Sequence, residues 1–260
     1  MSEEFEPTPI TAADDERHIQ CTEQDGILHI ALTRHDKKNA ITQKMYADMV
    51  DALNRANVAS AIKVVVIEGG ANFSAGNDLV DFLQGGGTGE SSPVFQFMMM
   101  LAHSKKPIVA AVDGFAVGIG TTALLHCDIV YCTERTTFML PFVNLGLVPE
   151  LGATKVLPRL AGYAKAAELL MLGEPFNHQV ASQIGLVNQV VTPEQLKEKA
   201  FETAKKLAAK PHNALLQTKE LMRNGMNVTD TIRDEARLFS LLLESDEAKA
   251  AMAAIMNRKK

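Results

Sequence analysis

Residues 62–79 read IKVVVIEGGANFSAGNDL, an apolar β-branched run that leads into a turn of small residues. The run at 62–68 is apolar on both faces, as in a parallel strand that is covered from both sides. In the turn at 73–79, small side chains let backbone amides approach a ligand closely. An ordinary strand-to-helix turn, with Asn77 or Asp78 capping the helix, explains the same residues equally well.

Similar patterns recur on both sides of this stretch. Asp25-Gly26 lies between two strand-like segments and is a dipeptide that favours a hairpin turn. Thr42 can cap a helix in which Met45, Met49 and Leu53 form a stripe at helical spacing. The strands predicted in this way are 18–24, 27–34, 62–68, 107–112 and 128–132, and the helices between them are 42–57 and 94–102.

After about residue 148 the strand pattern almost stops. The helices predicted there are 150–159, 164–172, 178–184, 193–209, 211–223, 228–244 and 246–257, and 186–191 is a single short apolar exception. Strands with crossover helices, followed by a helical region, predict an α/β fold. Residues 1–14, with two prolines and four acids, predict a mobile tail. The last ~60 residues predict a helical module, whose apolar faces must be covered by the rest of the chain or by a partner subunit.

Composition narrows the class of protein. The 260 residues carry a net charge of -5, which argues against nucleic acid as the main partner. Three cysteines without a CxxC pair predict neither a disulfide framework nor a zinc site, and they suit a reducing compartment. No apolar run approaches the ~18 residues of a membrane span, and the first residues lack the pattern of a secretory signal. These features predict a cytoplasmic soluble enzyme with no membrane partner.

Residues 113–123 read DGFAVGIGTTA and follow the strand predicted at 107–112. Their GIGTTA matches the GxGxxA fingerprint of dinucleotide-binding folds, but it comes after more than a hundred residues and no acid ends a suitable later strand. We therefore expect no dinucleotide. The glycines open a helix near Gly120, so free N–H groups and the positive end of the helix dipole face one spot. Such a spot suits a carbonyl oxygen that becomes negative during a reaction.

Residues 142–152 read FVNLGLVPELG, in which Pro149-Glu150 is a common way to begin a helix. A helix start is the simplest interpretation of this pair when nothing else is known. His126 lies in an apolar helix and is more typical of a satisfied core histidine than of a base. No second His, Cys or acid has ligand spacing to His126, so we predict no metal site.

Taken together, these segments resemble the crotonase superfamily, the enoyl-CoA hydratase/isomerase family, over residues 18–260. The elements that carry the resemblance are RHDKKNA (34–40), FSAGNDL (73–79), AVDGFAVG (111–118), CDIVY (127–131), LGLVPE (145–150) and GLV (185–187). The resemblance implies an α/β fold, in which residues 15–200 form a crotonase-like spiral of ββα turns. It also implies a C-terminal helical trimerisation region at 201–260, and thus a homotrimer or a dimer of trimers.

The resemblance further implies an acyl-CoA thioester as the substrate, in fatty-acid metabolism, and no cofactor, because coenzyme A is part of the substrate. It implies an oxyanion hole of two backbone N–H groups, which by position belong to Asn77 and Ile119. Family members hold CoA and the acyl group with residues around these motifs. The binding residues implied in this chain are Lys38, Ala40, Ala75, Gly76, Asn77, Asp78, Leu79, Gly118 and Phe142.

Departures from the family pattern bear on the reaction. Thr122 and Phe142 stand where hydratases of the family place two catalytic glutamates. Adding water to a double bond needs groups that deprotonate the water and reprotonate the carbon. Glu150 is present, and its Pro-Glu setting is similar to the peroxisomal-type Δ3-Δ2-enoyl-CoA isomerase branch. That similarity implies a 1,3-proton transfer by one carboxylate, through a dienolate held in the oxyanion hole.

Two alternatives stay open beside the isomerase. The first is an enoyl-CoA hydratase or another crotonase-type lyase, which the two missing glutamates oppose. The second is a non-catalytic acyl-CoA-binding or protein-interaction member that kept the fold. The presence of Glu150 opposes the second alternative, because a pocket without a base would be its signature.

Overall fold

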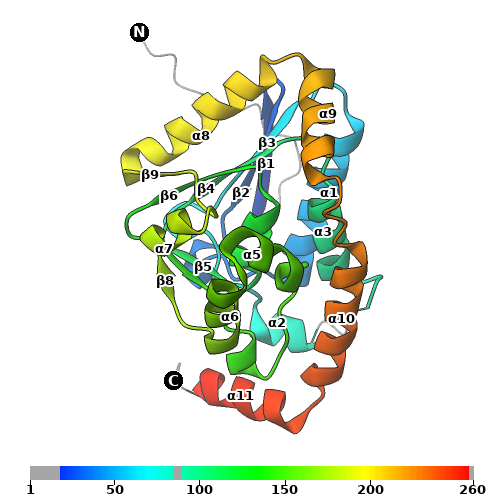
Figure 1. Cartoon of the computed structure of the whole chain (residues 1–260), viewed down its shortest axis with the longest axis vertical. Helices are drawn as coiled ribbons and strands as arrows, with labels where there is room; N and C mark the ends of the chain where they lie inside the picture. The colour runs from blue at the N-terminus through cyan, green and yellow to red at the C-terminus, as the bar shows by residue number, and fades with distance from the viewer. Residues whose placement is uncertain (1–17, 85–88, 258–260) are drawn as a thin grey trace.

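The computed structural model describes residues 18–84 and 89–257, and a mixed sheet runs through its centre (Figure 1). Within these residues the sheet has the strand order β1-β2-β3-β4-β6-β9, with β1 antiparallel to β2 and every later neighbour parallel. Its strands are β1 (Ile19–Gln24), β2 (Ile27–Leu32), β3 (Val64–Glu68), β4 (Ile108–Val112), β6 (Ile129–Thr133) and β9 (Gln189–Val191). The α/β class predicted from the sequence is confirmed.

The first two strands form the predicted hairpin. Asp25 and Gly26 connect them with φ angles of 53° and 77°, both in the left-handed region. Two consecutive left-handed residues define the turn whose twist matches that of paired strands, and Asp-Gly is among its preferred sequences. Gln24 is therefore paired directly with Ile27, and the register of the whole hairpin follows from this turn.

Helices cover both faces of the sheet, which explains why the run at 62–68 is apolar throughout. On one face, Val64 and Val66 pack in a cluster with Ala200 and Ala204 of α8 (Pro193–Ala208). On the other face, Val65 belongs to the main core, which also holds the buried stripes of α1 (Gln43–Val58) and α3 (Pro93–Ala102). Figure 1 shows α8 on the opposite side of the sheet from α1 and α3. Successive strand residues thus alternate between two apolar layers.

Helix α1 forms as its sequence predicts. Thr42 is the N-cap, and its hydroxyl accepts a hydrogen bond from the amide of Met45 at 3.3 Å. Met45, Met49 and Leu53 are all buried, at one-turn intervals along the helix. The cap fixes where the helix begins, and the stripe fixes which face it turns toward the sheet.

A second, three-stranded sheet was not predicted. It has the order β5-β7-β8, and its strands are β5 (Phe115–Val117), β7 (Thr137–Met139) and β8 (Phe176–Asn177). Strands of two or three residues are too short to establish a period-2 pattern in the sequence. Their pairing depends instead on partners that lie about 20 to 40 residues away, such as Ala116 with Phe138 and Phe138 with Phe176.

The remaining elements surround the two sheets. The helices are α2 (Leu79–Gln84), α4 (Ile119–Thr122), α5 (Ala153–Ala161), α6 (Tyr163–Leu172), α7 (His178–Gln183), α9 (His212–Arg223), α10 (Thr229–Leu243) and α11 (Asp246–Asn257), and the 3-10 turns are η1 (His35–Lys37), η2 (Ala123–His126) and η3 (Val143–Leu145). The predicted boundary between the spiral core and the C-terminal region, at residue 200, falls inside α8. The tail predicted at 1–14 lies outside the described residues.

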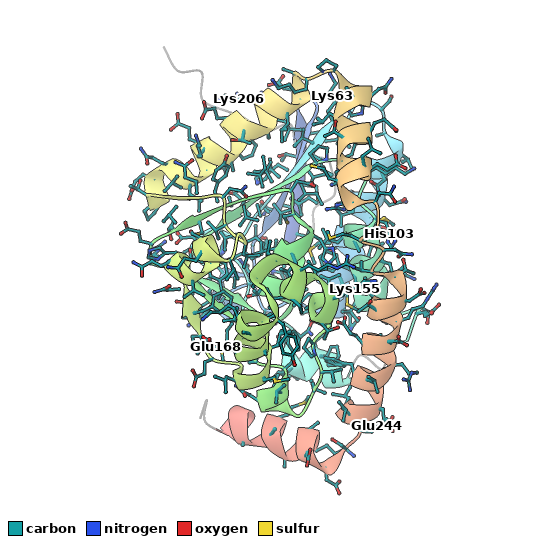
Figure 2. All side chains as sticks on the ribbon, in the orientation of Figure 1. Lys63, His103, Lys155, Glu168, Lys206 and Glu244 are labelled. Carbon is teal, nitrogen blue, oxygen red and sulfur yellow. The ribbon has the colours of Figure 1, made fainter. Side chains whose placement is uncertain are left out.

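Charged side chains gather at the margin of the molecule. Lys206 on α8, Glu168 on α6 and Glu244 after α10 are exposed and lie at the edge of the fold in Figure 2. In the part of the chain that the structure describes, no helix has the length and apolar character needed to cross a membrane.

Candidate active site

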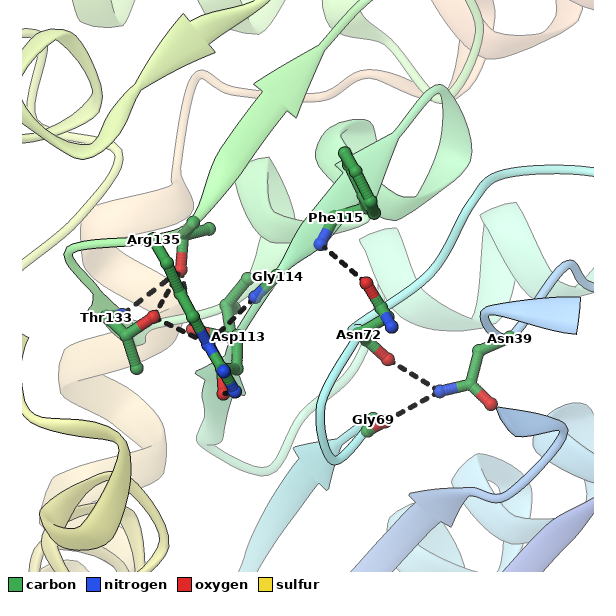
Figure 3. Close-up of polar contacts among 10 residues, drawn as sticks. Asn39, Gly69, Asn72, Asp113, Gly114, Phe115, Thr133 and Arg135 are labelled. Carbon is green, nitrogen blue, oxygen red and sulfur yellow. Dashed lines mark hydrogen bonds and ion pairs between the residues drawn. The ribbon is translucent and has the colours of Figure 1, made fainter. Parts of the chain in front are cut away.

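The loop after β3 is tied to the segment after β2 by one buried side chain. Asn39 donates from its amide nitrogen to the carbonyl oxygens of Gly69 and Asn72, at 2.7 and 2.6 Å (Figure 3). Its own carbonyl accepts from the hydroxyl of Ser74 at 2.8 Å. Asn39 adopts a φ of 54° and is fully buried. Asparagine tolerates this conformation better than most residues. Here its hydrogen bonds hold the segment around Asn39 against residues 69–74, and these two segments together are called the platform.

The backbone of Asn77 faces away from that platform. Ile41 donates its amide to the carbonyl of Gly76 at 2.8 Å and accepts from the amide of Asp78 at 2.9 Å. These two bonds make Ile41 and Asn77 partners in a parallel bridge. In such a bridge the middle residue points its own N–H and C=O to the opposite side. The amide of Asn77 is therefore directed out of the bridge and is free to meet a ligand.

The second glycine-containing loop packs directly on the first. Ser74 donates its amide to Phe115 at 2.8 Å and accepts from the amide of Val117 at 2.9 Å, which joins the loop to β5. A Cβ added to Gly76 would lie 3.0 Å from the carbonyl oxygen of Val117, and one added to Gly120 would lie 3.0 Å from the Ser74 side chain. Only glycine at these two positions allows the loops to approach this closely.

Helix α4 begins immediately after this contact. Gly118 has a φ of 55° and a ψ of -120°, and its carbonyl accepts from the amides of Thr121 and Thr122, both at 2.9 Å. Ile119 is the first residue of the helix, so its N–H has no partner one turn earlier in the helix. The structure thus brings the segment of Asn77 and the start of α4 at Ile119 into contact.

The segments predicted to bind CoA also meet. Ala75 donates its amide to the carbonyl of Lys38 at 2.9 Å. Arg34 donates to the carbonyl of Ala40 at 2.9 Å and to the carboxylate of Asp78 at 2.6 Å. Burial would raise the pKa of Asp78, but the Arg34 guanidinium and the first amides of α2 outweigh it and lower that pKa overall. Arg34 therefore holds the 38–40 segment and the first loop together. Leu79, the next residue after Asp78, is the first residue of α2.

The ammonium group of Lys38 lies 4.6 Å from the ring centroid of Phe115, an exposed side chain on β5. Phe115 is anchored through its amide to the side chain of Asn72, and the preceding Asp113 is held by Arg135 and Thr133 (Figure 3). The base of β5 is thus fixed on both sides. This contact at the surface keeps the ammonium group of Lys38 accessible to an anionic ligand.

The two positions where the resemblance predicts the glutamates of hydratases are Thr122 and Phe142, and both are buried here. Thr122 is fully buried in α4, and Phe142 is 4% exposed. The ring of Phe142 lies 4.0 Å from the place where a Cβ of Gly118 would be. Phe142 therefore borders the start of the second loop, and no carboxylate is available at either position.

Glu150 does not begin a helix, so the simplest interpretation of the Pro149-Glu150 pair is wrong. Helix α5 starts at Ala153, and Gly152 is its N-cap without a side-chain bond of its own. Glu150 is 4% exposed, and among the residues that the structure describes its Oε1 atom has no hydrogen-bond partner. Burial, and secondarily the charge of Glu235, raises the pKa of Glu150 to about 8. An unpaired buried carboxyl with a high proton affinity is typical of a catalytic acid or base.

Tyr46 bonds to the first loop and lies within electrostatic reach of Glu150, and sequence reasoning missed it. Its hydroxyl donates to the side-chain oxygen of Asn77. Burial, and then the charges of Glu150 and Asp81, raises the pKa of Tyr46 well above its ordinary value. Glu150 is thus near enough to act electrostatically on a group bonded to Asn77. The signal in the sequence is a hydroxyl-bearing residue beside Met45 in the apolar stripe of α1.

His126 is satisfied in the core, as predicted. Its Nε2–H donates to the carbonyl of Leu151 at 2.7 Å, and burial lowers its pKa to about 4. The imidazole is therefore neutral and only a weak base. No cluster of three or more His, Cys, Asp or Glu side chains suited to a metal ion occurs among residues 18–84 and 89–257.

The chain is similar to known proteins in sequence and in structure. The sequence profile of the enoyl-CoA hydratase/isomerase family matches residues 22–260. Enoyl-CoA delta isomerase 2 of Rattus norvegicus is 35% identical over 82% of this chain, which spans 56% of the rat protein's length. The 2,3-dehydroadipyl-CoA hydratase of Escherichia coli is 31% identical over 91% of this chain and 94% of its own. The structure of OdaA from Pseudomonas aeruginosa superposes with a TM-score of 0.90 at 42% identity, covering 93% of this chain and 99% of that one.

Proposed function

The chain belongs to the enoyl-CoA hydratase/isomerase family, and we propose that within it the protein is a Δ3-Δ2-enoyl-CoA isomerase with Glu150 as its proton carrier. The observation that carries this proposal is the Glu150 carboxyl, buried with one oxygen unpaired and with its pKa raised to about 8. A carboxylate with so high a proton affinity is a stronger base than an exposed one. It is therefore suited to remove a weakly acidic proton beside a thioester.

The proposed reaction moves one proton and keeps every other atom of the substrate. The thioester oxygen accepts hydrogen bonds from the amides of Asn77 and Ile119. The Glu150 carboxylate removes a proton from carbon 2 of a 3-enoyl-CoA, and the C2–H electrons move into a dienolate whose negative charge rests on the thioester oxygen. The same carboxyl then returns its proton at carbon 4, which leaves the double bond between carbons 2 and 3.

The positions Thr122 and Phe142 favour isomerisation over hydration. Hydration needs a second group that holds and activates a water molecule, whereas the 1,3-shift needs only one base and one oxyanion hole. Phe142 beside Gly118 supplies an apolar ring where a water-binding carboxylate would be required. Both isomerases and hydratases occur among the relatives at similar identity, so the argument rests on these residues rather than on the comparisons.

Residues of the two loops and of the 38–40 segment are proposed to hold the CoA portion. The amide of Ala75 donates to the carbonyl of Lys38, so the first loop and the 38–40 segment lie against each other. Lys38 can leave the ring of Phe115 to meet a phosphate of CoA.

The test is to offer the purified protein a 3-enoyl-CoA and a 2-enoyl-CoA separately and to follow the products by mass and retention. We expect the 3-enoyl-CoA to be converted to its 2-enoyl isomer without a change of mass. We expect little 3-hydroxyacyl-CoA, which is heavier by one water. Hydration of 2-enoyl-CoA with kcat/KM above about 10⁴ M⁻¹s⁻¹ would restore the hydratase alternative.

A further inference from the structure

The turn that carries Glu150 has an unusual backbone. Leu151 has a φ of 60° and Gly152 a φ of 71°, so two consecutive residues lie in the left-handed region. Leucine rarely adopts this conformation, and it persists only where the surroundings hold it in place. Leu151 is fully buried, and its carbonyl accepts the hydrogen bond from His126 on η2. One side of the turn is therefore held by a neutral histidine.

The other side of the turn is held by Glu235, which lies on α10 more than 80 residues away in the sequence. Its Oε2 accepts from the amide of Gly152 at 2.6 Å. Its Oε1 accepts from the amide and the hydroxyl of Thr154, at 3.0 and 2.6 Å. A carboxylate at this place satisfies the first amides of α5 and meets the positive end of its dipole. Glu235 therefore acts as the cap that the N-terminus of α5 lacks locally.

The two acidic side chains at this turn have opposite surroundings. Burial raises the pKa of Glu235 overall, and the three hydrogen bonds donated to its carboxylate oppose this rise and favour the ionised form. Glu150 receives no donor at Oε1. The donors stabilise the carboxylate form of Glu235, whereas no donor stabilises that form at Oε1 of Glu150, so Glu150 is the carboxyl that holds its proton more readily.

Other charged groups near the turn do not compensate this charge. The charges of Glu150 and of Asp81 from α2 both act on Tyr46 from α1 and raise its pKa, after the larger effect of burial. His126 from η2 is neutral because its pKa is lowered to about 4. Among the cations on α5 and α10, Arg159, Arg233 and Arg237 are exposed and Lys155 is partly exposed. Lys155 bonds to the carbonyl of Asn227, Arg159 to the carbonyl of Gly225 and Arg233 to Glu90.

We propose that Glu235 is a positioning residue for Glu150, because its carboxylate both fixes the left-handed turn and stands as an uncompensated negative charge beside the catalytic carboxyl. This inference rests on the proposed function for the role of Glu150 in catalysis. Glu235 does not touch the substrate. It sets the place from which Glu150 reaches the substrate and keeps the proton affinity of Glu150 high.

The test compares Glu235→Gln, which removes the charge, with Glu235→Asp, which keeps the charge but shortens the reach. In Glu235→Gln the pH midpoint of kcat/KM should fall by about one unit, as expected when a neighbouring like charge is lost. The ratio of kcat/KM at pH 6 to that at pH 9 should then rise about tenfold, whatever uniform loss of activity accompanies it. In Glu235→Asp the midpoint should stay near that of the wild type while kcat falls.

A purely structural role of Glu235 predicts a different result. Both variants would lose stability and turnover, and the pH midpoint would not move in either. An unmoved pH midpoint in Glu235→Gln therefore overturns the inference. A Glu235→Asp variant with an acid-shifted midpoint, or with an unchanged kcat, overturns it as well. If Glu235→Gln does not fold, Glu235→Asp still tests the inference, because an acid-shifted midpoint or an unchanged kcat in that variant would overturn it. Glu244→Gln, which removes an exposed acid beyond the end of the same helix, serves as the control and should change neither quantity.

A substrate-free measurement separates this inference from the proposed function. The carboxyl carbon of Glu150 can be titrated by ¹³C NMR in the full chain, with its signal assigned by its loss in Glu150→Gln. Its midpoint should fall in Glu235→Gln, and an unchanged midpoint overturns the inference regardless of activity. Wild-type protein that leaves 3-enoyl-CoA unconverted refutes the isomerase instead, and that result does not depend on the titration.

Discussion

The hydroxyl of Tyr46 donates a hydrogen bond to the side-chain oxygen of Asn77, across 31 residues of sequence. Tyr46 lies on the buried face of α1, and its ring packs against Phe97 of α3 with centroids 5.4 Å apart. The first loop is therefore anchored to the helical layer through the residue whose amide is proposed to bind the thioester oxygen. Because the pKa of Tyr46 is raised well above its ordinary value, its hydroxyl stays protonated and remains a donor.

Tyr46→Phe should lower both stability and activity. Losing this hydrogen bond leaves the Asn77 oxygen without its partner and should cost about 1 kcal/mol in the free energy of unfolding. The less constrained loop should lower kcat/KM for 3-enoyl-CoA by roughly tenfold, since the oxyanion donors must be held in place. Urea denaturation and steady-state kinetics measure the two effects.

Tyr131→Phe is the matched control for this substitution. The hydroxyl of Tyr131 bonds to Thr203 at 2.8 Å, and its ring packs with α8 on the other face of the sheet. We expect a comparable loss of stability with normal kcat/KM. Equal losses of activity in both variants would show that the anchor at Asn77 has no special effect on turnover.

Glu150→Gln should abolish most of the isomerase activity. The amide keeps the size of the side chain but cannot accept and return a proton, so kcat should fall by about 10²-fold or more. Binding of the CoA thioester should change little, because the amides of Asn77 and Ile119 are untouched. Turnover of the variant at the wild-type rate would disprove the assignment of Glu150 as the base.

The same substitution should change how stability depends on pH. The pKa of Glu150 is about 8 in the folded protein and near its ordinary value of 4.5 when unfolded. Between these values the folded state retains a proton that the unfolded state has released. The contribution of Glu150 to stability therefore falls as pH rises from about 4.5 to about 8, by roughly 1.4 kcal/mol for each unit of the pKa difference.

Glu150→Gln has no carboxyl to titrate, so its stability should not fall between pH 4.5 and 8 for this reason. The variant should be more stable than the wild type at pH 8.5, with little difference at pH 4.5. Thermal unfolding across this pH range is the measurement, with Glu168→Gln on the exposed face of α6 as the control. A variant that is less stable than the wild type at pH 8.5 would show that the carboxyl is not held in its neutral form.

We propose that the chain forms a homotrimer or a dimer of trimers. Large apolar side chains on the C-terminal helices are exposed in the single chain: Leu221 is 70%, Met222 69% and Leu241 64% exposed. Side chains of this kind on adjacent helices are typical of a surface that is covered by another subunit. Sedimentation analysis should give the mass of a trimer or a hexamer, and a stable monomer at micromolar concentration would contradict the proposal.

Local pattern in the sequence was enough to predict the layers of the fold. The strands of the main sheet, the hairpin turn at Asp25-Gly26 and the capped helix after Thr42 each depend on residues within a few positions of one another. Propensity, periodicity and capping act over that range, so one segment carries the whole signal. The two glycine loops were predicted for the same reason, since each follows a recognisable buried strand.

Tertiary structure alone decided what these segments do together. The strands of the second sheet are too short to have a period, and they form because distant partners pair with them. Helix α5 begins at Ala153 and not at Glu150, where the sequence predicted its start. Glu235 from α10 caps this helix, a role that the sequence assigned to Pro149-Glu150. The sequence by itself identified Glu150 as the candidate carboxylate. Its burial and its high proton affinity come from side chains far away along the chain, where no local pattern could predict them.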